Sequence, residues 1–461
     1  MKILLVAPKA WKYFGIAAEP LPPLGLAYLS AVLKERGDKV KILDNYVCEY
    51  HNVEHVINSF KPDVVGISIN SITARHGYEI AKIAKEKEII TIVGGPHATL
   101  MPEKAVSNDN IDHVVVGEGE ITLKKLLNNI ENGNNERIKG VYYKNGKFLP
   151  REFIKDLDTL PYPDWDTLNL NNYPRESFFT KSKLKPLDTV NTSRGCPFNC
   201  TFCSVGSVSG KIHRAFSPRR MVEEILLLKE KYKSKIIFFR EDNFTANRKR
   251  IENFCNLMIE EKIDISWMCE SRVDALNKDL LIEMRKAGCE TIFFGIESGS
   301  QKMLDCINKG IKVEQIEKIM KLCKKIGIGT TASFLIGVPG ETYQTVRETV
   351  RFIIKIDPDV FWFNVYRPTP NSILYNEILD KSWYEHYDEF TGLCLVKTSN
   401  FDFNTVKMWE KKAWRGEILN TKYWRFKLKR LGFRIFKELI DALRYKIIDM
   451  FMNNERPTCD I

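Results

Sequence analysis

The stretch that decides both fold and chemistry is Ser-Arg-Gly-Cys-Pro-Phe-Asn-Cys-Thr-Phe-Cys, residues 193–203. Its cysteines, Cys196, Cys200 and Cys203, are separated by three and then two residues, so a short loop can wrap around one corner of an iron–sulfur cube. Thiolates are the usual ligands of such clusters, normally four of them. Only three lie together here, and an open coordination position is typical of a reactive metal site. The spacing also fits a zinc knuckle in which His213 is the fourth ligand.

The cysteine loop follows the first strand of a long series in which strands alternate with helices. Six successive βα units predict a partial (βα)6 barrel of the TIM type, and such barrels do their chemistry at the C-terminal ends of the strands. The predicted strands are Thr189–Ser193, Lys235–Arg240, Asp264–Glu270, Glu290–Gly295, Gly329–Gly337 and Val360–Tyr366, and the predicted helices are Met221–Tyr232, Arg248–Glu260, Lys278–Ala287, Val313–Ile326 and Thr342–Ile356.

The N-terminal part of the chain predicts a second parallel sheet. Short apolar strands alternate with helical segments there, which is typical of an α/β, doubly wound, Rossmann-like sheet whose ligands lie beyond the carboxyl ends of the strands. Gly37 follows the first helix, where glycine often ends a helix. The predicted strands are Lys2–Ala7, Lys39–Leu43, Val64–Ser68, Ile89–Val93 and His113–Val116, and the predicted helices are Leu24–Arg36, Tyr78–Lys87 and Thr122–Ile130.

Between the two series the chain changes character. Tyr142–Leu149 has hairpin character around its Asn-Gly pair, and the Pro-rich stretch Leu160–Pro174 is expected to lack regular structure. We therefore predict a Rossmann-like domain (1–139), a connector (140–187), a partial barrel (188–385) and a basic helical C-terminal domain (386–461).

Composition bounds the function. Of 461 residues, 44% are hydrophobic, and no uninterrupted apolar stretch reaches the roughly 18–20 residues that a membrane span needs. Eleven cysteines without an export signal favour a reducing cytoplasm over disulfides. The cysteines outside the triad lack ligand spacing, so most of them are expected to be small buried hydrophobic residues. They are Cys48, Cys255, Cys269, Cys289, Cys306, Cys323, Cys394 and Cys459, the last of which is expected to be exposed.

The net charge of +11 gathers near the C-terminus. Lys407–Lys446 carries thirteen Lys or Arg against four Asp or Glu, and aromatic residues are interleaved with them. This pattern predicts an amphipathic basic helix. It fits a helical cap with a solvated face, contact with a membrane surface or lipid substrate, or contact with RNA.

Further motifs make the second series resemble the radical S-adenosylmethionine superfamily. The resemblance rests on the cysteine spacing and on three segments at strand ends, Phe239–Phe244, Phe294–Gly299 and Phe334–Glu341. It implies that the three cysteines hold a [4Fe–4S] cluster and that the fourth iron binds S-adenosylmethionine, whose cleavage gives a 5′-deoxyadenosyl radical. The implied contacts are Glu241 or Asp242 for the methionine amino group, Arg272 for the carboxylate, Glu297 or Ser298 for the ribose or methionyl part, and the turn from Gly337 to Glu341 for the adenine.

Four segments at or just past strand ends carry a second resemblance: Pro20–Leu29, Val65–Ile69, Val93–Ala98 and Val116–Glu120. They make the first series resemble the cobalamin-binding domain that precedes the radical domain in one branch of this superfamily. The glycines at its strand ends let the backbone approach a bulky ligand, where a Cβ would collide. No DxHxxG motif is present to supply a lower axial histidine, so His97 is expected to be a pocket contact. The candidate contacts are Ser68, Gly94, Gly95, His97, Gly117, Glu118 and Gly119, with hydroxyls of Ser71 and Thr73 for a nucleotide tail. A flavodoxin-like sheet that binds another nucleotide or nothing is the alternative.

The resemblance predicts an enzyme that methylates an unactivated carbon and uses an external electron donor such as flavodoxin or ferredoxin. The same cofactors also serve cyclisation, oxidation and rearrangement. A cobalamin-responsive regulator would need no open iron site, and methylthiotransferases need N-terminal cysteines where only Cys48 is present. The sequence identifies neither a catalytic residue nor the substrate. We expect an organic substrate, with a lipid or another hydrophobic molecule as one alternative, and nucleic acid is disfavoured as a partner.

Overall fold

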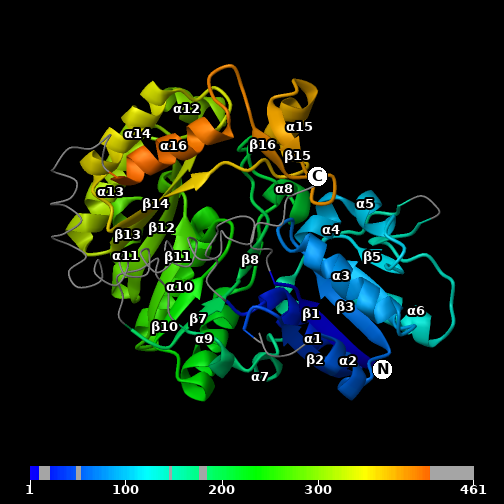
Figure 1. The fold of residues 1–461 in the computed structure, drawn as a ribbon. Coiled ribbons are helices and arrows are strands. Elements are labelled where there is room, and N and C mark those ends of the chain that lie inside the picture. Colours follow the sequence, from blue (N-terminus) through cyan, green and yellow to red (C-terminus); the bar gives the residue numbers. More distant parts are fainter. Residues whose placement is uncertain (10–20, 48–52, 145–147, 176–183, 416–461) are drawn as a thin grey trace.

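The computed structural model describes residues 1–9, 21–47, 53–144, 148–175 and 184–415, which form two parallel sheets lying side by side (Figure 1). Both predicted parts of the fold class are therefore confirmed: the N-terminal Rossmann-like sheet and the partial barrel. The part of the predicted basic C-terminal helix that follows residue 415 lies outside the described residues, as does the Asn-Gly turn of the predicted connector hairpin.

The N-terminal sheet has the strand order β2-β1-β3-β4-β5-β6, and only β6 runs antiparallel to its neighbour. Its inner strands are nearly all apolar, as expected for a parallel sheet that helices cover on both faces. The predicted strands are confirmed to within one residue at each end. The strands are β1 (Lys2–Ala7), β2 (Lys39–Asp44), β3 (Val64–Ser68), β4 (Ile90–Gly94), β5 (His113–Val115) and β6 (Val141–Tyr142), and the helices are α1 (Leu24–Glu35), α2 (Val53–Phe60), α3 (Ala74–Lys85), α4 (Pro96–Leu100), α5 (Pro102–Val106) and α6 (Glu120–Glu131).

The second sheet is an open, curled half-barrel with the sequential order β7-β10-β11-β12-β13-β14, all parallel. Each predicted βα unit is present. The strands are β7 (Leu187–Val190), β10 (Ile236–Phe239), β11 (Ser266–Ser271), β12 (Cys289–Glu297), β13 (Gly329–Ile336) and β14 (Val360–Val365), and the helices are α9 (Pro218–Tyr232), α10 (Arg248–Glu260), α11 (Lys278–Lys286), α12 (Gln301–Cys306), α13 (Val313–Ile326), α14 (Tyr343–Ile356) and α15 (Ile373–Asp380).

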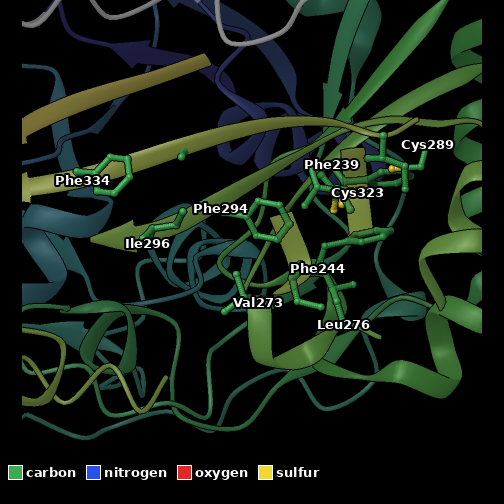
Figure 2. Close-up of a cluster of buried hydrophobic side chains, with 14 of the residues drawn as sticks. Phe239, Phe244, Val273, Leu276, Cys289, Phe294, Ile296, Cys323 and Phe334 are labelled. Carbon is green, nitrogen blue, oxygen red and sulfur yellow. The ribbon is translucent and has the colours of Figure 1, made fainter. Parts of the chain in front are cut away.

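Buried aromatic rings fill the space between the half-barrel strands and their helices (Figure 2). The ring of Phe239 lies 4.6 Å from that of Phe244 and meets Trp267 edge-on at 5.7 Å. Such pairs add to the stabilisation that burial already provides. Five cysteines share this core and are buried, as predicted: Cys255, Cys269, Cys289 and Cys323, which are fully buried, and Cys394, which is 3% exposed.

The connector joins the two sheets through packing and hydrogen bonds. The Tyr173 hydroxyl donates to Asp44 of β2 at 2.8 Å, and the Tyr162 hydroxyl donates to Glu223 of α9 at 2.7 Å. Tyr28 of α1 also stacks directly on Phe216 of the second half, with ring centroids 6.1 Å apart. The stretch predicted to lack regular structure, Leu160–Pro174, instead contains the helical turn α7 (Trp165–Leu168) and the 3₁₀ turn Leu170–Asn172. A further 3₁₀ turn, Leu157–Thr159, precedes it. The prediction was wrong for α7 because the Asp164 side chain accepts a hydrogen bond from the Thr167 amide and caps the turn.

The described C-terminal part consists of a hairpin, β15 (Tyr384–Tyr387) with β16 (Cys394–Val396), and the helix α16 (Phe403–Arg415). The helix lies over the half-barrel beside α14, and the hairpin reaches toward the N-terminal sheet (Figure 1). Within the described ranges, no helix combines the length and the apolar character required to cross a bilayer.

Candidate active site

The cysteine loop is pinned at its base by two short antiparallel strands, β8 (Ser193–Arg194) and β9 (Arg214–Ala215). Inside this base the Cys196 amide donates to the Gly210 carbonyl at 3.1 Å. Gly195 has a φ of +84°, and a Cβ there would lie 2.4 Å from the Ile212 carbonyl oxygen. The loop therefore needs glycine directly before its first cysteine, because the two arms of the loop touch at that point.

The three thiols lie close enough to influence one another's ionisation, and each is partly exposed. Burial, together with the nearby carboxylate of Asp242 and the other thiols, raises the pKa of the Cys203 thiol to about 11. Bound iron reverses this effect, since a coordinating thiol is deprotonated outright. The three thiols are thus the residues that would hold an iron–sulfur cluster in this loop.

Across the described ranges, no three His, Cys, Asp or Glu side chains are arranged to hold one metal ion. The charges that act on the His213 ring are those of Arg250, Glu241 and Arg214, and burial lowers the pKa of this histidine. The zinc-knuckle alternative, which needs His213 beside the thiols, therefore gains no support.

Arg272, at the end of β11, is held against the cysteine loop. Its guanidinium forms two hydrogen bonds to Asp274, at 2.9 and 2.8 Å, and donates to the Lys309 carbonyl at 2.6 Å. It also lies 3.7 Å from the centroid of the Phe198 ring and 3.6 Å from the Cys200 sulfur. Arg272 is thus an electropositive neighbour of the cluster cysteines, and its pairing with a methionine carboxylate stays a prediction.

The adjacent residues Glu241 and Asp242 differ in what they contact. Glu241 is buried and accepts from the Thr192 amide at 2.8 Å and from the Thr192 and Ser193 hydroxyls. Arg250 of α10 donates to the Thr192 carbonyl at 2.9 Å and completes this support beneath the loop. Asp242 instead is exposed and lines a cavity. Of the two predicted acceptors, Asp242 is the one free to meet a ligand.

The predicted contacts at the ends of β12 and β13 are buried and constrained. Glu297 has a φ of +69° and pairs with Lys309 at 2.9 Å. The Ser298 hydroxyl lies 3.0 Å from the Thr349 hydroxyl. Backbone strain of this kind gathers at functional sites, where surrounding contacts hold it in place. Sequence reasoning missed Lys309, because only the fold brings it under Glu297.

The turn after β13 is closed by Glu341, whose carboxylate accepts the Gly337 amide. Burial raises the pKa of Glu341 to about 8, although the Gly337 and Val338 amides oppose the shift. A Cβ on Gly337 would lie 2.8 Å from the Val406 side chain of α16, so the C-terminal helix packs directly on this turn.

A cavity of about 410 Å³ opens between the N-terminal strand ends and the cysteine loop. Both sheets contribute to its wall. The N-terminal lining includes Leu5, Gly66, Ser68, Gly94, Gly95, Gly117, Glu118, Gly119 and Glu120, and the lining from the second half includes Asn191, Ser193, Arg194, Val208, Ser209 and Asp242. Seven predicted contacts thus share one cavity: six of those predicted for cobalamin and Asp242.

The lining is mostly apolar and rich in glycine, as is typical of a ligand pocket. Gly95 has a φ of +91°, and a Cβ there would lie 2.8 Å from the Ile69 carbonyl oxygen. A Cβ on Gly66 would lie 2.9 Å from the Leu5 side chain. Both positions require glycine because a Cβ would collide with neighbouring strand atoms, so the strand ends pack closely beneath the cavity. The residues present therefore fit cobalamin.

His97 lies elsewhere. It is fully buried but does not line the cavity, and its Nδ1 is 3.4 Å from the Ser71 hydroxyl. Burial lowers the pKa of His97 to about 4, while Asp388 and the Phe390 backbone of the C-terminal hairpin raise it slightly. The ring is therefore a neutral packing residue beneath the hairpin, and the geometry lends no support to its predicted pocket role.

Two family models match the chain, and residues from both matched regions line this cavity. Residues 190–353 match the radical SAM superfamily and residues 13–127 match a B12 binding domain. A Pyrococcus horikoshii protein named as an uncharacterized methyltransferase is 37% identical over 84% of this chain and 86% of its own length. The chain belongs to the radical SAM enzymes that carry a B12-binding domain. Its cofactors are a [4Fe–4S] cluster, S-adenosylmethionine and cobalamin.

Another relative of this B12-binding radical SAM enzyme is named for a different reaction. The anaerobic magnesium-protoporphyrin IX monomethyl ester cyclase of Rubrivivax gelatinosus is 31% identical over 83% of this chain and 70% of its own length. Among solved structures, the radical SAM methyltransferase TsrM of Kitasatospora setae matches with a TM-score of 0.74 at 16% identity, covering 91% of this chain and 89% of TsrM. The cobalamin-dependent radical SAM enzyme OxsB matches with the same TM-score at 18% identity, over 90% of this chain and 66% of OxsB. These two likenesses show the fold.

Proposed function

We propose that this B12-binding radical SAM enzyme transfers a methyl group to an unactivated carbon of an organic substrate. The observation that carries the proposal is the shared cavity, whose wall is built by glycine-rich strand ends on one side and by the base of the cysteine loop on the other. When bound, the cofactors supply a primary carbon radical on the barrel side and a transferable methyl group on the N-terminal side. A substrate between them is within reach of both.

The chain's own residues bind, orient and shield. Cys196, Cys200 and Cys203 hold the cluster, and Arg272 fixes the loop that carries them. Asp242 offers a carboxylate to the cavity. Apolar side chains along the N-terminal strands exclude water, which protects a reactive radical from side reactions.

The proposed domain boundaries remain 1–139, 140–187, 188–385 and 386–461. The enzyme needs an electron donor and an organic substrate, and we propose a flavodoxin or ferredoxin as the donor. Membrane or lipid contact through the basic segment is a further proposal that rests on the sequence, because most of that segment lies beyond the described residues.

Labelling tests the reaction. The protein is reconstituted anaerobically with iron, sulfide and cobalamin, then reduced in the presence of S-adenosylmethionine that carries a trideuterated methyl group and of a small-molecule extract. We expect 5′-deoxyadenosine and a product that has gained the labelled methyl. Failure to form 5′-deoxyadenosine would contradict the radical assignment.

Cyclisation is the second candidate, favoured by the named reaction of the Rubrivivax gelatinosus relative. The same experiment separates the two. A product that has lost hydrogen and gained no label would support cyclisation or oxidation and overturn methyl transfer, while 5′-deoxyadenosine would form in both cases.

A further inference from the structure

Five charged side chains meet where the N-terminal sheet contacts the cysteine loop. Glu118 comes from the turn between β5 and α6, Glu120 is the first residue of α6, Arg151 comes from the connector, and Arg194 and Arg214 come from β8 and β9. The side chains are between 6% exposed, for Glu120, and 15% exposed, for Arg194. Charges are seldom buried this deeply unless they are paired. We refer to these five residues as the clasp.

The ion pairs of the clasp cross between regions far apart in the sequence. Arg214 Nη1 lies 2.6 Å from Glu118 Oε1, and Arg151 Nη1 lies 3.2 Å from Glu118 Oε2. Arg194 Nη2 lies 2.6 Å from Glu120 Oε1, and Arg194 Nη1 lies 3.5 Å from Glu118 Oε1. Burial would raise the pKa of Glu118, but Arg194, Arg214 and the Ile154 amide outweigh it and lower that pKa, so this carboxylate is held ionised.

The clasp also holds the connector between the two sheets. Glu118 Oε2 accepts the Ile154 amide at 3.0 Å, and Arg214 donates to the Ile154 carbonyl at 2.8 Å. The Phe153 ring lies 4.6 Å from the Arg214 guanidinium and 5.3 Å from that of Arg151. The backbone of Ile154 thus bonds to one charged side chain of the N-terminal half, Glu118, and to one at the base of the cysteine loop, Arg214.

Both cofactor sites adjoin the clasp. Glu118, Glu120 and Arg194 line the shared cavity. Arg194 stands two residues before Cys196, and its guanidinium lies 5.6 Å from the centroid of the Tyr28 ring on α1. A displacement of these charges would therefore move the base of the cysteine loop relative to the N-terminal strand ends.

Stability alone is a weak reason for such an arrangement. Replacing buried ion pairs by apolar residues is often neutral or stabilising, whereas a polar group that fixes register is the best-attested use of buried charge. The neighbouring contact between Tyr28 and Phe216 shows that aromatic packing is available at this interface. Charge in the clasp is therefore better explained by geometry that must be specific.

We propose that the clasp sets the separation and orientation of the cobalamin relative to the [4Fe–4S] cluster. This inference rests on the proposed function, in which one substrate must reach both cofactors. The five residues are positioning residues. Near-attack geometry tolerates little displacement, so a fixed spacing between the two cofactors matters for methyl transfer more than for radical formation, which needs only the barrel side.

Spectroscopy of the holoenzyme tests the clasp without knowledge of the substrate. Cob(II)alamin and the reduced cluster are both paramagnetic, and their dipolar interaction depends on the distance between them. The variants are Arg214→Gln, Glu118→Gln and the double variant, and Glu152→Gln is the matched control, because Glu152 is a connector carboxylate with a side chain that is 82% exposed. Bound iron, bound cobalamin and 5′-deoxyadenosine formation are measured alongside.

In wild type and in Glu152→Gln we expect a narrow distribution of distances between cob(II)alamin and the reduced cluster. In Arg214→Gln and in Glu118→Gln we expect a broader distribution and a weaker dipolar interaction. The double variant restores the wild-type surplus of one positive charge in the clasp, so it should recover part of the narrow interaction, a non-additivity typical of paired groups. If either single variant retains the wild-type interaction, the clasp does not set the separation.

Two further outcomes are also decisive. If Arg214→Gln fails to fold, Arg214→Lys keeps the charge but loses the planar fork, and the same broadening is expected there; a wild-type signal in Arg214→Lys would then contradict the proposal. If wild type itself binds no cobalamin or forms no 5′-deoxyadenosine, the proposed function fails and the inference fails with it.

Discussion

The two parallel sheets of this enzyme use the carboxyl ends of their strands in different ways. The N-terminal sheet contributes mainly backbone: glycines at positions 66, 94, 95, 117 and 119 line the cavity, and at all of them but Gly94 a Cβ would lie 3.1 Å or less from a neighbouring protein atom. The half-barrel contributes side chains, above all three cysteines and an arginine held against them. One region lines the cavity with closely packed backbone, and the other supplies the side chains that we propose as cluster ligands.

This difference has a physical cause. Cobalamin is large and arrives with its metal already held by its own ring, so the protein must mainly enclose it. An iron–sulfur cluster has no such ring, and protein thiolates must hold its irons. Substitutions should therefore fail in different ways in the two regions: by loss of ligand bonds in the half-barrel and by steric exclusion in the N-terminal sheet.

The largest effect is expected for Cys200→Ala. Loss of one of three thiolates should abolish the cluster, so bound iron falls and 5′-deoxyadenosine formation is lost, while cobalamin is still retained on gel filtration. Cys306→Ser is the matched control, because Cys306 is an exposed cysteine of the same half-barrel outside the loop. Wild-type levels of 5′-deoxyadenosine from Cys200→Ala would overturn the cluster assignment.

A smaller but still severe effect is expected for Gly95→Ala in the N-terminal sheet. A non-glycine residue at a φ of +91° is strained, by roughly 1–3 kcal/mol. The Cβ would also meet the Ile69 carbonyl at 2.8 Å, which adds roughly 1–3 kcal/mol of overpacking. Urea unfolding should report the summed loss, and cobalamin retention should fall while bound iron stays.

Gly37→Ala separates strain from crowding. Gly37 has a φ of +96°, but nothing lies within 4 Å of a Cβ built there. It should lose only about 1–2 kcal/mol for its backbone conformation and should retain cobalamin. If Gly95→Ala binds cobalamin as well as Gly37→Ala does, the close packing of the N-terminal strand ends does not shape the cobalamin site.

Sequence reasoning performed best where the chemistry needs a rare residue at short spacing. The cysteine triad and the order of both strand series could be predicted, because ligand spacing and apolar periodicity are local properties. Gly37 was predictable for the same reason, since a helix end and its glycine are neighbours in the chain.

Contacts between distant segments could not be predicted. Arg194 and Glu120 are 74 residues apart in sequence, and neither belongs to a motif that names the other. Glu241 and Asp242 are adjacent acidic residues, yet one supports the cysteine loop and the other faces the cavity. Only the path of the chain after β10 decides which carboxylate turns inward.

The smallest predicted effects concern two buried titratable groups, one in each region. They make the free energy of unfolding depend on pH with opposite signs. In the N-terminal part, burial lowers the pKa of His97 to about 4. In the half-barrel, burial raises the pKa of Glu224 of α9 to about 7, and neither carboxylate oxygen of Glu224 has a hydrogen-bond partner among the described residues. Near pH 6 the His97 imidazole is therefore uncharged, and the Glu224 carboxyl is largely protonated and uncharged as well.

For His97, the unfolded chain binds more protons than the folded chain between pH 6.5 and about 4, so the free energy of unfolding falls as the pH falls through this window. For Glu224, the unfolded chain ionises above pH 4.5 while the folded chain keeps its proton to about pH 7, so the free energy of unfolding falls as the pH rises. Each unit of pH within a window changes stability by at most about 1.4 kcal/mol.

Urea unfolding of wild type, His97→Gln and Glu224→Gln at pH 5, 6.5 and 8 measures both slopes. His97→Gln should lose less stability than wild type between pH 6.5 and 5, because glutamine does not bind a proton there. Glu224→Gln should gain on wild type between pH 5 and 8. Curves that stay parallel to wild type in both variants would show that neither group is kept neutral by burial, and the contrast in sign between the two regions would then rest on other residues.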